Sequence, residues 1–271
     1  MYYFLKDDKL HSFFEKLLQL FFPMGTYCIC CGKYIDLTRT YLICDQCMSS
    51  INWGHICIDL EQERKKSGRT KYLDSVLSCM VYGMHSKRLV FDLKYNKKTF
   101  LARPISYIMA DRLLTDDTLG DLLNRIDYVI PIPLNQKRQK KRGFNQASLI
   151  ASCLTDRLNA SLKSHNILFL EKALKRDKPT IEQRSVTGGQ RFSNLEGAFS
   201  LSPIYLPRIA DSVILLIDDI FTTGATADRC ARILKDAGAK EVHFLSLATG
   251  NYYLMGASRP RNDEEFLSSI D

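Results

Sequence analysis

Residues 211–238, DSVILLIDDIFTTGATADRCARILKDAG, constrain the fold more than any other stretch of the sequence. Residues 213–217 are continuously apolar and mostly β-branched or leucine, which is typical of a strand in a parallel sheet covered on both faces. Small and apolar residues then recur at helical spacing from Ala227 to Ala237, and Gly238 is suited to end that helix. The stretch therefore predicts an α/β fold with this strand inside a parallel sheet.

The chemistry of this stretch lies between the strand and the helix. We expect the strand to end at Asp218 and Asp219, because open α/β sheets bind ligands at the carboxyl ends of their strands. Five small residues follow, and their N–H groups can converge on an anion at the helix N-terminus. They are Thr222, Thr223, Gly224, Ala225 and Thr226. Carboxylates accept hydrogen bonds from sugar hydroxyls but repel phosphate, so the pattern favours a ribose 5-phosphate.

Strand, Asp-Asp and TTGAT together resemble the phosphoribosyl pyrophosphate (PRPP) motif of type I phosphoribosyltransferases. Two adjacent acids alone more often mark only the end of a strand, but TTGAT in register favours the functional interpretation. The resemblance implies that Asp218 and Asp219 are catalytic and hold the ribose hydroxyls, while residues 222–226 hold the 5-phosphate. It also implies Mg²⁺ bound with PRPP. The stretch has neither a G-x-x-x-x-G-K phosphate loop nor a G-x-G-x-x-G dinucleotide turn.

Two C-x-x-C pairs precede this domain, Cys28 with Cys31 and Cys44 with Cys47. Their spacing is typical of a ribbon in which four thiolates hold one structural Zn²⁺. Cys30 lies inside the first pair, and we interpret it as a spare thiol. The alternative is reduced cysteines without metal. The chain has nine cysteines, an odd number, and several stand in apolar stretches, which favours a reducing cytoplasm over a disulfide framework.

A basic segment follows a second apolar strand predicted at residues 127–133. It carries Lys137, Arg138, Lys140, Lys141 and Arg142, then Gly143, and we expect a loop before a helix that starts near Ala147. The loop could meet pyrophosphate or the backbone of single-stranded DNA, and the net charge of +8 suits either anion. A smaller cluster, Lys94 with Lys97 and Lys98, is interpreted by default as a solvated turn, and a contribution to anion binding is the alternative.

The segments PIPLNQKRQKKRGFNQA, RDKPTIEQRSVTGGQRFSNLEGAF and VILLIDDIFTTGAT, behind a cysteine ribbon, resemble the competence protein F (ComF) family. The resemblance covers about residues 20–248. It implies a type I phosphoribosyltransferase-like parallel sheet with a small N-terminal four-cysteine zinc ribbon, and a part in the uptake of transforming DNA. Residues 178–199 would be the flexible loop, with Gln183, Arg191 and Asn194 at matching positions. The sequence RSVTGG after Gln183 departs from the family's more hydrophobic pattern.

These motifs predict three regions: residues 1–61 with a helix and the ribbon, 72–250 with the phosphoribosyltransferase-like domain, and a loosely ordered tail at 251–271. No stretch is apolar enough to span a membrane, although Phe13, Phe14 and Leu17 could form an interfacial helix. We expect a cytoplasmic protein that binds PRPP and single-stranded DNA, and that meets competence proteins at the inner face of the membrane. The alternative is an active phosphoribosyltransferase with an unidentified acceptor; a non-catalytic regulator of nucleotide synthesis is a third.

Overall fold

The computed structural model describes residues 27–36, 39–53, 56–58, 60, 71–162, 165–177 and 197–250. The chain divides into two compact units, Met1–Ser50 and Ile51–Asp271. Three expectations lie outside the described residues: the apolar helix near Phe13, the flexible-loop residues Gln183, Arg191 and Asn194, and the tail at 251–271. In the described part of the chain, no helix has the length and apolar character needed to cross a membrane.

The first unit is held by short-range hydrogen bonds around its cysteines. Tyr27 and Tyr34 form an isolated antiparallel bridge, and their rings meet edge to face at 6.1 Å. The turn between them closes through Cys28 N–H, which donates to the Lys33 carbonyl at 2.7 Å. Gly32 has a φ of 77°, a left-handed value that favours glycine at this turn. Helix α2 (Asp45–Ser50) begins directly after Cys44, the first cysteine of the second pair.

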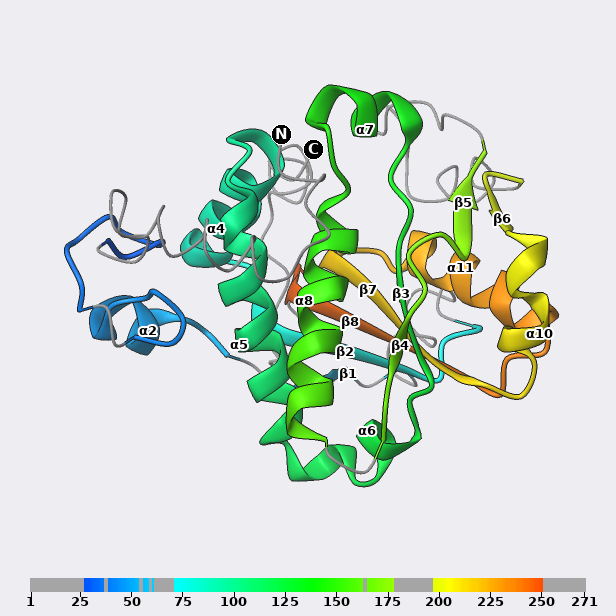
Figure 1. The fold of residues 1–271 in the computed structure, drawn as a ribbon. Coiled ribbons are helices and arrows are strands. Elements are labelled where there is room, and N and C mark those ends of the chain that lie inside the picture. The colour runs from blue at the N-terminus through cyan, green and yellow to red at the C-terminus, as the bar shows by residue number, and fades with distance from the viewer. Residues whose placement is uncertain are drawn as a thin grey trace, which may run out of the picture. The chain divides into compact units, whose positions relative to one another are not determined.

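The second unit is built on a six-stranded sheet with the order β1-β2-β8-β7-β3-β4 (Figure 1). Strand β1 is antiparallel to β2, and all the other neighbours are parallel. The strands are β1 (Cys57–Ile58), β2 (Ser75–Val81), β3 (Tyr128–Pro131), β4 (Leu168–Phe169), β7 (Val213–Phe221) and β8 (Glu241–Thr249). A separate antiparallel pair is formed by β5 (Leu174–Arg176) and β6 (Phe199–Leu201). The predicted parallel sheet is confirmed, with β7 inside it.

Helices cover both faces of this sheet. Helices α5 (Ala102–Leu114) and α8 (Gln146–Ser161) pack side by side (Figure 1). Helix α8 contacts β7 and β3, and α5 contacts β2 and β8. Helix α11 (Ala225–Asp236) packs on the other face, where Ile214 and Leu216 of β7 share a core with its Cys230 and Leu234. Because alternate residues of a strand face opposite sides, Leu215 and Ile217 point toward α5 and α8. The remaining helices are α4 (Met84–Tyr95), η1 (Thr99–Leu101), η2 (Asp117–Leu119), α6 (Leu122–Arg125), α7 (Gln136–Arg142), η4 (Pro203–Tyr205) and α10 (Leu206–Ile209).

Three local predictions differ from the structure. Strand β7 does not end at Asp218 but continues to Phe221, since its pairing with β8 runs on from Asp218 with Ser246 to Phe221 with Thr249. Residues 84–95 form helix α4, so Lys94 lies on a helix and not in the expected turn. The basic segment is helix α7 rather than a loop.

Helix α7 forms because its ends carry the right capping residues. Asn135 accepts a hydrogen bond from the Lys137 N–H at 2.9 Å, which caps the N-terminus. Gly143 ends the helix with a φ of 86° in the left-handed region. None of the seven residues of α7 is buried. The segment is therefore a surface helix that owes its position to its caps and not to a hydrophobic face.

Candidate functional site

The candidate site lies at the carboxyl ends of the neighbouring strands β3 and β7. Strand β7 leads into the TTGAT segment and α11, while β3 leads into α7. Because parallel neighbours end at the same edge of a sheet, the acidic pair, the TTGAT segment and α7 all leave the sheet at that edge. The structure thus brings together the two groups of residues that the sequence assigned to PRPP.

The TTGAT segment forms the start of α11. Gly224 is the residue before the helix and has a φ of 71°, which a side chain at Cβ would strain. The Thr223 hydroxyl lies 3.5 Å from the Ala225 nitrogen. The first N–H groups of a helix have no partner within the helix, and they carry its partial positive charge. Thr222, Thr223 and Thr226 are partly exposed around this helix start, so the segment can receive a phosphate.

Asp218 and Asp219 differ in their surroundings although they are adjacent. Asp219 is 3% exposed, and its Oδ2 lies 2.9 Å from the Nζ of Lys94 in α4. Asp218 keeps partial exposure, and its Oδ1 accepts the Asp219 N–H at 2.8 Å. Burial raises the pKa of Asp218, the charge of Asp219 adds to this, and Lys94 offsets part of it, so that the pKa reaches about 7. One of the two carboxyls therefore exchanges its proton near neutral pH.

Lys94 is a site residue whose place the sequence analysis missed. It was interpreted as part of a solvated turn, but it is buried and pairs with Asp219. Of its two companions, Lys98 pairs with Asp92 at 2.7 Å and Lys97 is exposed. The signal was present in the spacing. Lys94 follows Val90 by four residues and so falls on the buried stripe of α4. The buried residues of this helix are Ser86, Leu89, Val90, Asp92, Leu93 and Lys94.

A second cation near the site, Arg176 of β5, was not predicted either. Its guanidinium lies 5.1 Å from the centre of the Phe199 ring, across the β5–β6 pair. Burial lowers the pKa of Arg176, and the charge of Arg138 in α7 adds to this, while Asp218 acts in the opposite direction. The charges of Arg138 in α7 and of Asp218 therefore both act on Arg176. Arg176 is the first residue of the segment RDKPTIEQRSVTGGQRFSNLEGAF, but the expected flexible loop began at residue 178, so no role was predicted for it.

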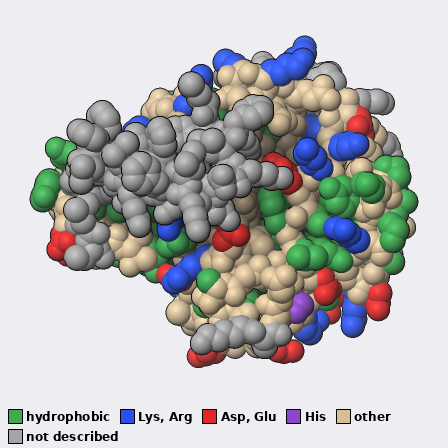
Figure 2. All heavy atoms as spheres, viewed as in Figure 1, with side chains coloured by type: hydrophobic (Ala, Val, Ile, Leu, Met, Phe, Trp, Pro, Cys, Tyr) green, Lys and Arg blue, Asp and Glu red, His purple; other side chains and the backbone are tan. Residues whose placement is uncertain are grey.

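The basic helix α7 presents its lysines to solvent. Lys137, Lys140 and Lys141 are exposed, and Arg138 and Arg142 are partly exposed. Figure 2 shows Lys and Arg side chains gathered at the top of this face, where α7 lies in Figure 1. Arg142 is more constrained than the lysines, since it donates to Gln146 Oε1 at 2.8 Å and lies 5.1 Å from the centre of the Tyr95 ring.

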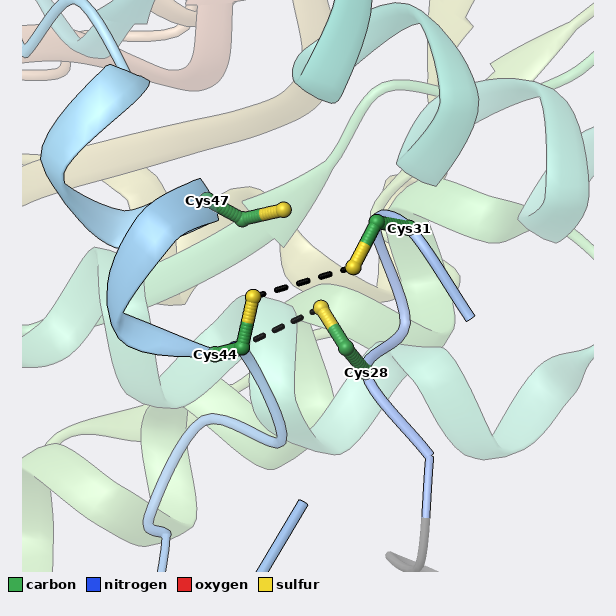
Figure 3. A group of neighbouring side chains, drawn as sticks. All are labelled: Cys28, Cys31, Cys44 and Cys47. Carbon is green, nitrogen blue, oxygen red and sulfur yellow. Dashed lines mark hydrogen bonds between the residues drawn. The ribbon is translucent and has the colours of Figure 1, made fainter. Parts of the chain in front are cut away.

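The four predicted metal ligands come together in the first unit. The sulfur atoms of Cys28, Cys31, Cys44 and Cys47 all lie within 4.8 Å of one another. Their side chains point toward a shared centre from the first turn, from the chain before α2 and from α2 itself (Figure 3). Cys30 is buried but does not belong to this group. The choice of these four thiols over Cys30 is consistent with the geometry.

The sulfur geometry fits a tetrahedral ion. Zinc–sulfur bonds of about 2.3 Å in a tetrahedron place the sulfurs about 3.8 Å apart, and the Sγ atoms of Cys31 and Cys44 are 3.7 Å apart. Burial raises the pKa of Cys28, but the N–H groups of Cys44, Cys31 and Cys30 outweigh it and lower the pKa to about 6. Such N–H groups stabilise a thiolate, the form that binds a metal. The group can therefore hold a metal ion with no position left open for catalysis.

Comparisons with known proteins agree with this picture. Residues 142–264 match the family model of the phosphoribosyl transferase domain. Competence protein F of Haemophilus influenzae is 34% identical over 229 residues, which cover 82% of this chain and 96% of that protein. DNA utilization protein YhgH of Escherichia coli O157:H7 is 30% identical over 155 residues, 57% of this chain and 63% of that protein. Competence protein ComFC of Bacillus subtilis is 34% identical over 110 residues, 41% of this chain and 39% of that protein.

The expected fold class is thereby confirmed: a phosphoribosyltransferase-type α/β domain follows a four-cysteine group. The match to the phosphoribosyl transferase domain begins at Arg142, the last residue of α7, and includes β7 and the start of α11. The match to competence protein F covers most of both chains, so it is not limited to this one motif.

Proposed function

The chain belongs to the competence protein F family, and we propose that it binds PRPP and single-stranded DNA during the uptake of transforming DNA. One observation carries the proposal. The acidic pair with its helix N-terminus and the exposed basic helix α7 leave adjacent strands at the same edge of the sheet. A sugar phosphate can bind at the first, and an extended polyanion can follow the second. The names of the relatives, competence protein and DNA utilization protein, support a role with DNA.

In the proposed PRPP complex, the 5-phosphate lies at the start of α11, where the helix N–H groups and Gly224 allow close approach. The acidic pair receives the ribose hydroxyls. Pyrophosphate extends toward the cations of α7 with Mg²⁺, which would offset its charge. The roles expected of Gln183, Arg191 and Asn194 in the flexible loop remain part of this proposal.

Titration calorimetry and thermal unfolding with PRPP and Mg²⁺ test the small-molecule part. PRPP should stabilise the wild type by about RT ln(1 + [L]/Kd), roughly 2.7 kcal/mol at a hundredfold excess over Kd. Asp218→Asn should remove about half or more of this stabilisation without unfolding the protein. Asp211→Asn is the matched control, because Asp211 is exposed before the other end of β7 and its φ of 57° suits asparagine. A wild type that does not bind PRPP contradicts the proposal.

The DNA part is proposed for the lysines of α7, with the protein acting in the cytoplasm beside competence proteins at the inner face of the membrane. Lysines that neutralise phosphates release counterions, so affinity for single strands should fall with salt at about −0.7 in log–log slope per phosphate. A fluorescent oligonucleotide titrated at several salt concentrations measures this slope. The absence of binding to single strands even at low salt contradicts this part alone.

A second candidate function is an active phosphoribosyltransferase that transfers the ribosyl group of PRPP to an acceptor. The match of residues 142–264 to the phosphoribosyl transferase domain favours it. In such a reaction the site would stabilise positive charge on the sugar and negative charge on departing pyrophosphate. Exchange of labelled pyrophosphate into PRPP, with and without nucleobases, separates this candidate from ligand binding alone.

We also propose that the four-cysteine group holds one structural Zn²⁺. The spacing of the four sulfurs supports it, since four thiolates complete the coordination of a structural zinc. Elemental analysis should find about one zinc per chain, and Cys47→Ser should lower both the metal content and the solubility. Cys30→Ser is the control and should keep the metal. Loss of zinc in Cys30→Ser with retention in Cys47→Ser would show that the ligands were wrongly assigned.

A further inference from the structure

The two carboxylates of the acidic pair do not face the same surroundings. Both lie within β7, because the strand continues past them to Phe221. Adjacent residues of a strand project from opposite faces of the sheet. The alternation puts Asp219 on the side of Leu215 and Ile217 and Asp218 on the side of Ile214 and Leu216, although the two carboxyls stay close enough for their side chains to interact. A ligand on one face therefore cannot meet the two side chains in the same way.

The two carboxylates also differ in their ion-pair partners and in their exposure. On its side Asp219 meets the Nζ of Lys94 at 2.9 Å, and the side chains are 5% and 9% exposed respectively. On the other side the charge of Asp218 acts on Cys230 of α11 and on Arg176 of β5. Asp219 thus has a fixed protein partner, whereas Asp218 keeps partial exposure.

Lys94 is held in place by the helix that carries it. The neighbouring Leu93 is fully buried, as is Leu89 one turn earlier. Two residues before Lys94, Asp92 accepts hydrogen bonds from Asn96 at 2.6 Å and Lys98 at 2.7 Å, and these bonds fix the end of α4. A lysine in this position has little freedom to leave Asp219 and follow a ligand, so the ion pair is a fixed part of the site.

We propose that Lys94 is a positioning residue: it holds Asp219 away from the ligand and leaves Asp218 as the carboxylate that receives the ribose hydroxyls. This inference rests on the proposed PRPP site and deepens it, since it gives unlike roles to two residues that the sequence motif treats alike. Lys94 has a second effect, because its charge offsets that of Asp219 next to Asp218.

The charge of Lys94 gives the inference a measurable signature, which is its effect on the pKa of Asp218. The charged or titratable groups around Asp218 are Asp219 on its own strand, Lys94 on α4, Arg176 on β5 and Cys230 on α11. Of these, Asp219 raises the pKa of Asp218 and Lys94 lowers it. Removing Lys94 alone leaves the charge of Asp219 without its offset, so the pKa of Asp218 should rise above about 7. Removing both charges should lower it again.

Carboxyl titration by NMR in protein labelled with ¹³C at aspartate Cγ tests this signature without any ligand. The Asp218 signal is assigned by its loss in Asp218→Asn. Its midpoint should move to higher pH in Lys94→Met and return in Lys94→Met with Asp219→Asn. Lys98→Met is the matched control, because it removes a lysine from the same segment that pairs with Asp92 and not with Asp219. An unmoved midpoint in Lys94→Met overturns the inference.

PRPP binding supplies the second measurement. Asp218→Asn should weaken PRPP binding roughly tenfold to a hundredfold, the loss expected for hydrogen bonds to a charged group. The double variant Lys94→Met with Asp219→Asn should bind PRPP more tightly than Asp218→Asn. If instead the folded double variant binds as weakly as Asp218→Asn, then Asp219 meets the ligand directly and the inference is wrong. Failure of the wild type to bind PRPP would defeat the proposed function, while the ligand-free titration still decides the role of Lys94.

Discussion

The end of α4 and helix α7 each carry three lysines within a few residues, yet the structure uses them differently. At the end of α4, Lys94 is buried against Asp219, and Lys98 pairs with Asp92. In α7 all three lysines are exposed and no residue of the helix is buried. The number of lysines in a segment therefore does not decide whether a given lysine is buried or exposed. Its position relative to an apolar stripe does, since α4 has such a stripe and α7 has none.

The largest effect is expected where the charge is buried. Lys94→Met leaves the Asp219 carboxylate buried without its partner, which should lower the free energy of unfolding by about 3–5 kcal/mol. Urea unfolding followed by circular dichroism measures the change. The Lys98 side chain is 42% exposed and its partner Asp92, though buried, keeps the hydrogen bond from Asn96, so Lys98→Met should cost less, about 1.5–3 kcal/mol. Equal losses for the two variants would remove the distinction between the lysines of this segment.

The pH dependence of the free energy of unfolding should come in part from Asp218, which is next to the buried ion pair of Asp219 and Lys94. The pKa of Asp218 is raised from 3.8 to about 7, so between these values the folded state binds more protons than the unfolded state. The free energy of unfolding should therefore fall as pH rises from about 4 to about 7, and the slope should be at most one proton. His243, whose pKa burial lowers, acts in the opposite direction. The difference between wild type and Asp218→Asn isolates the contribution of Asp218.

Asp218 also gives the two proposed ligands different pH profiles. A carboxylate accepts hydrogen bonds from hydroxyls better when it is ionised, so PRPP affinity should increase as pH rises through about 7. Asp218 does not belong to the proposed single-strand surface on α7, so affinity for single strands should be nearly constant over this range. Parallel profiles for both ligands would contradict separate sites.

Substitutions of the exposed lysines of α7 should change the binding of single strands and leave the free energy of unfolding nearly unchanged. Lys140→Gln with Lys141→Gln should flatten the salt dependence of single-strand binding by about 1.4 log–log units, with stability within about 0.5 kcal/mol. Arg142 is left unchanged because it bonds Gln146. The control, Arg208→Gln with Lys240→Gln, removes the same charge from exposed residues that precede β7 and β8. Equal flattening in both variants would show a net-charge effect and no role for α7.

The sequence predicted most of what depends on local patterns. The apolar run before Asp218 gave the central strand, the C-x-x-C pairs gave the four thiols that gather in one group, and the small residues before Ala227 gave the start of α11. Helix α7 was missed because it has no apolar face, although Asn135 and Gly143 stood at its ends as capping residues. The missed signal was the pair of caps.

The rest depends on contacts between distant segments. The continuation of β7 past Asp218 comes from pairing with Ser246 to Thr249 of β8, which no feature of residues 211–238 contains. The partner of Lys94 could not be read from the sequence either, because Asp219 lies far along the chain. The spacing of α4 could indicate that Lys94 is buried, but only the folded sheet determines which carboxylate it meets.

The smallest expected effect concerns the contact between the two regions themselves. Arg142 at the end of α7 lies 5.1 Å from the centre of the Tyr95 ring, and Tyr95 is the residue after Lys94 on α4. Such a contact between a guanidinium and a partly exposed ring contributes about 0.5–1 kcal/mol. A double-mutant cycle with Tyr95→Leu and Arg142→Gln should therefore give a coupling free energy of this size in urea unfolding.

The same cycle with Phe91→Leu in place of Tyr95→Leu is the control. The Phe91 ring centre lies 5.0 Å from that of Tyr95, and the described residues show no cation contact for Phe91. Its coupling to Arg142→Gln should be smaller than that of Tyr95, because Phe91 reaches Arg142 only through Tyr95, which contacts both. Zero coupling for Tyr95 would make α4 and α7 energetically independent. In that case PRPP at the acidic pair and DNA on α7 could not influence each other through this contact, and any competition between them would have to come from direct overlap at the shared edge of the sheet.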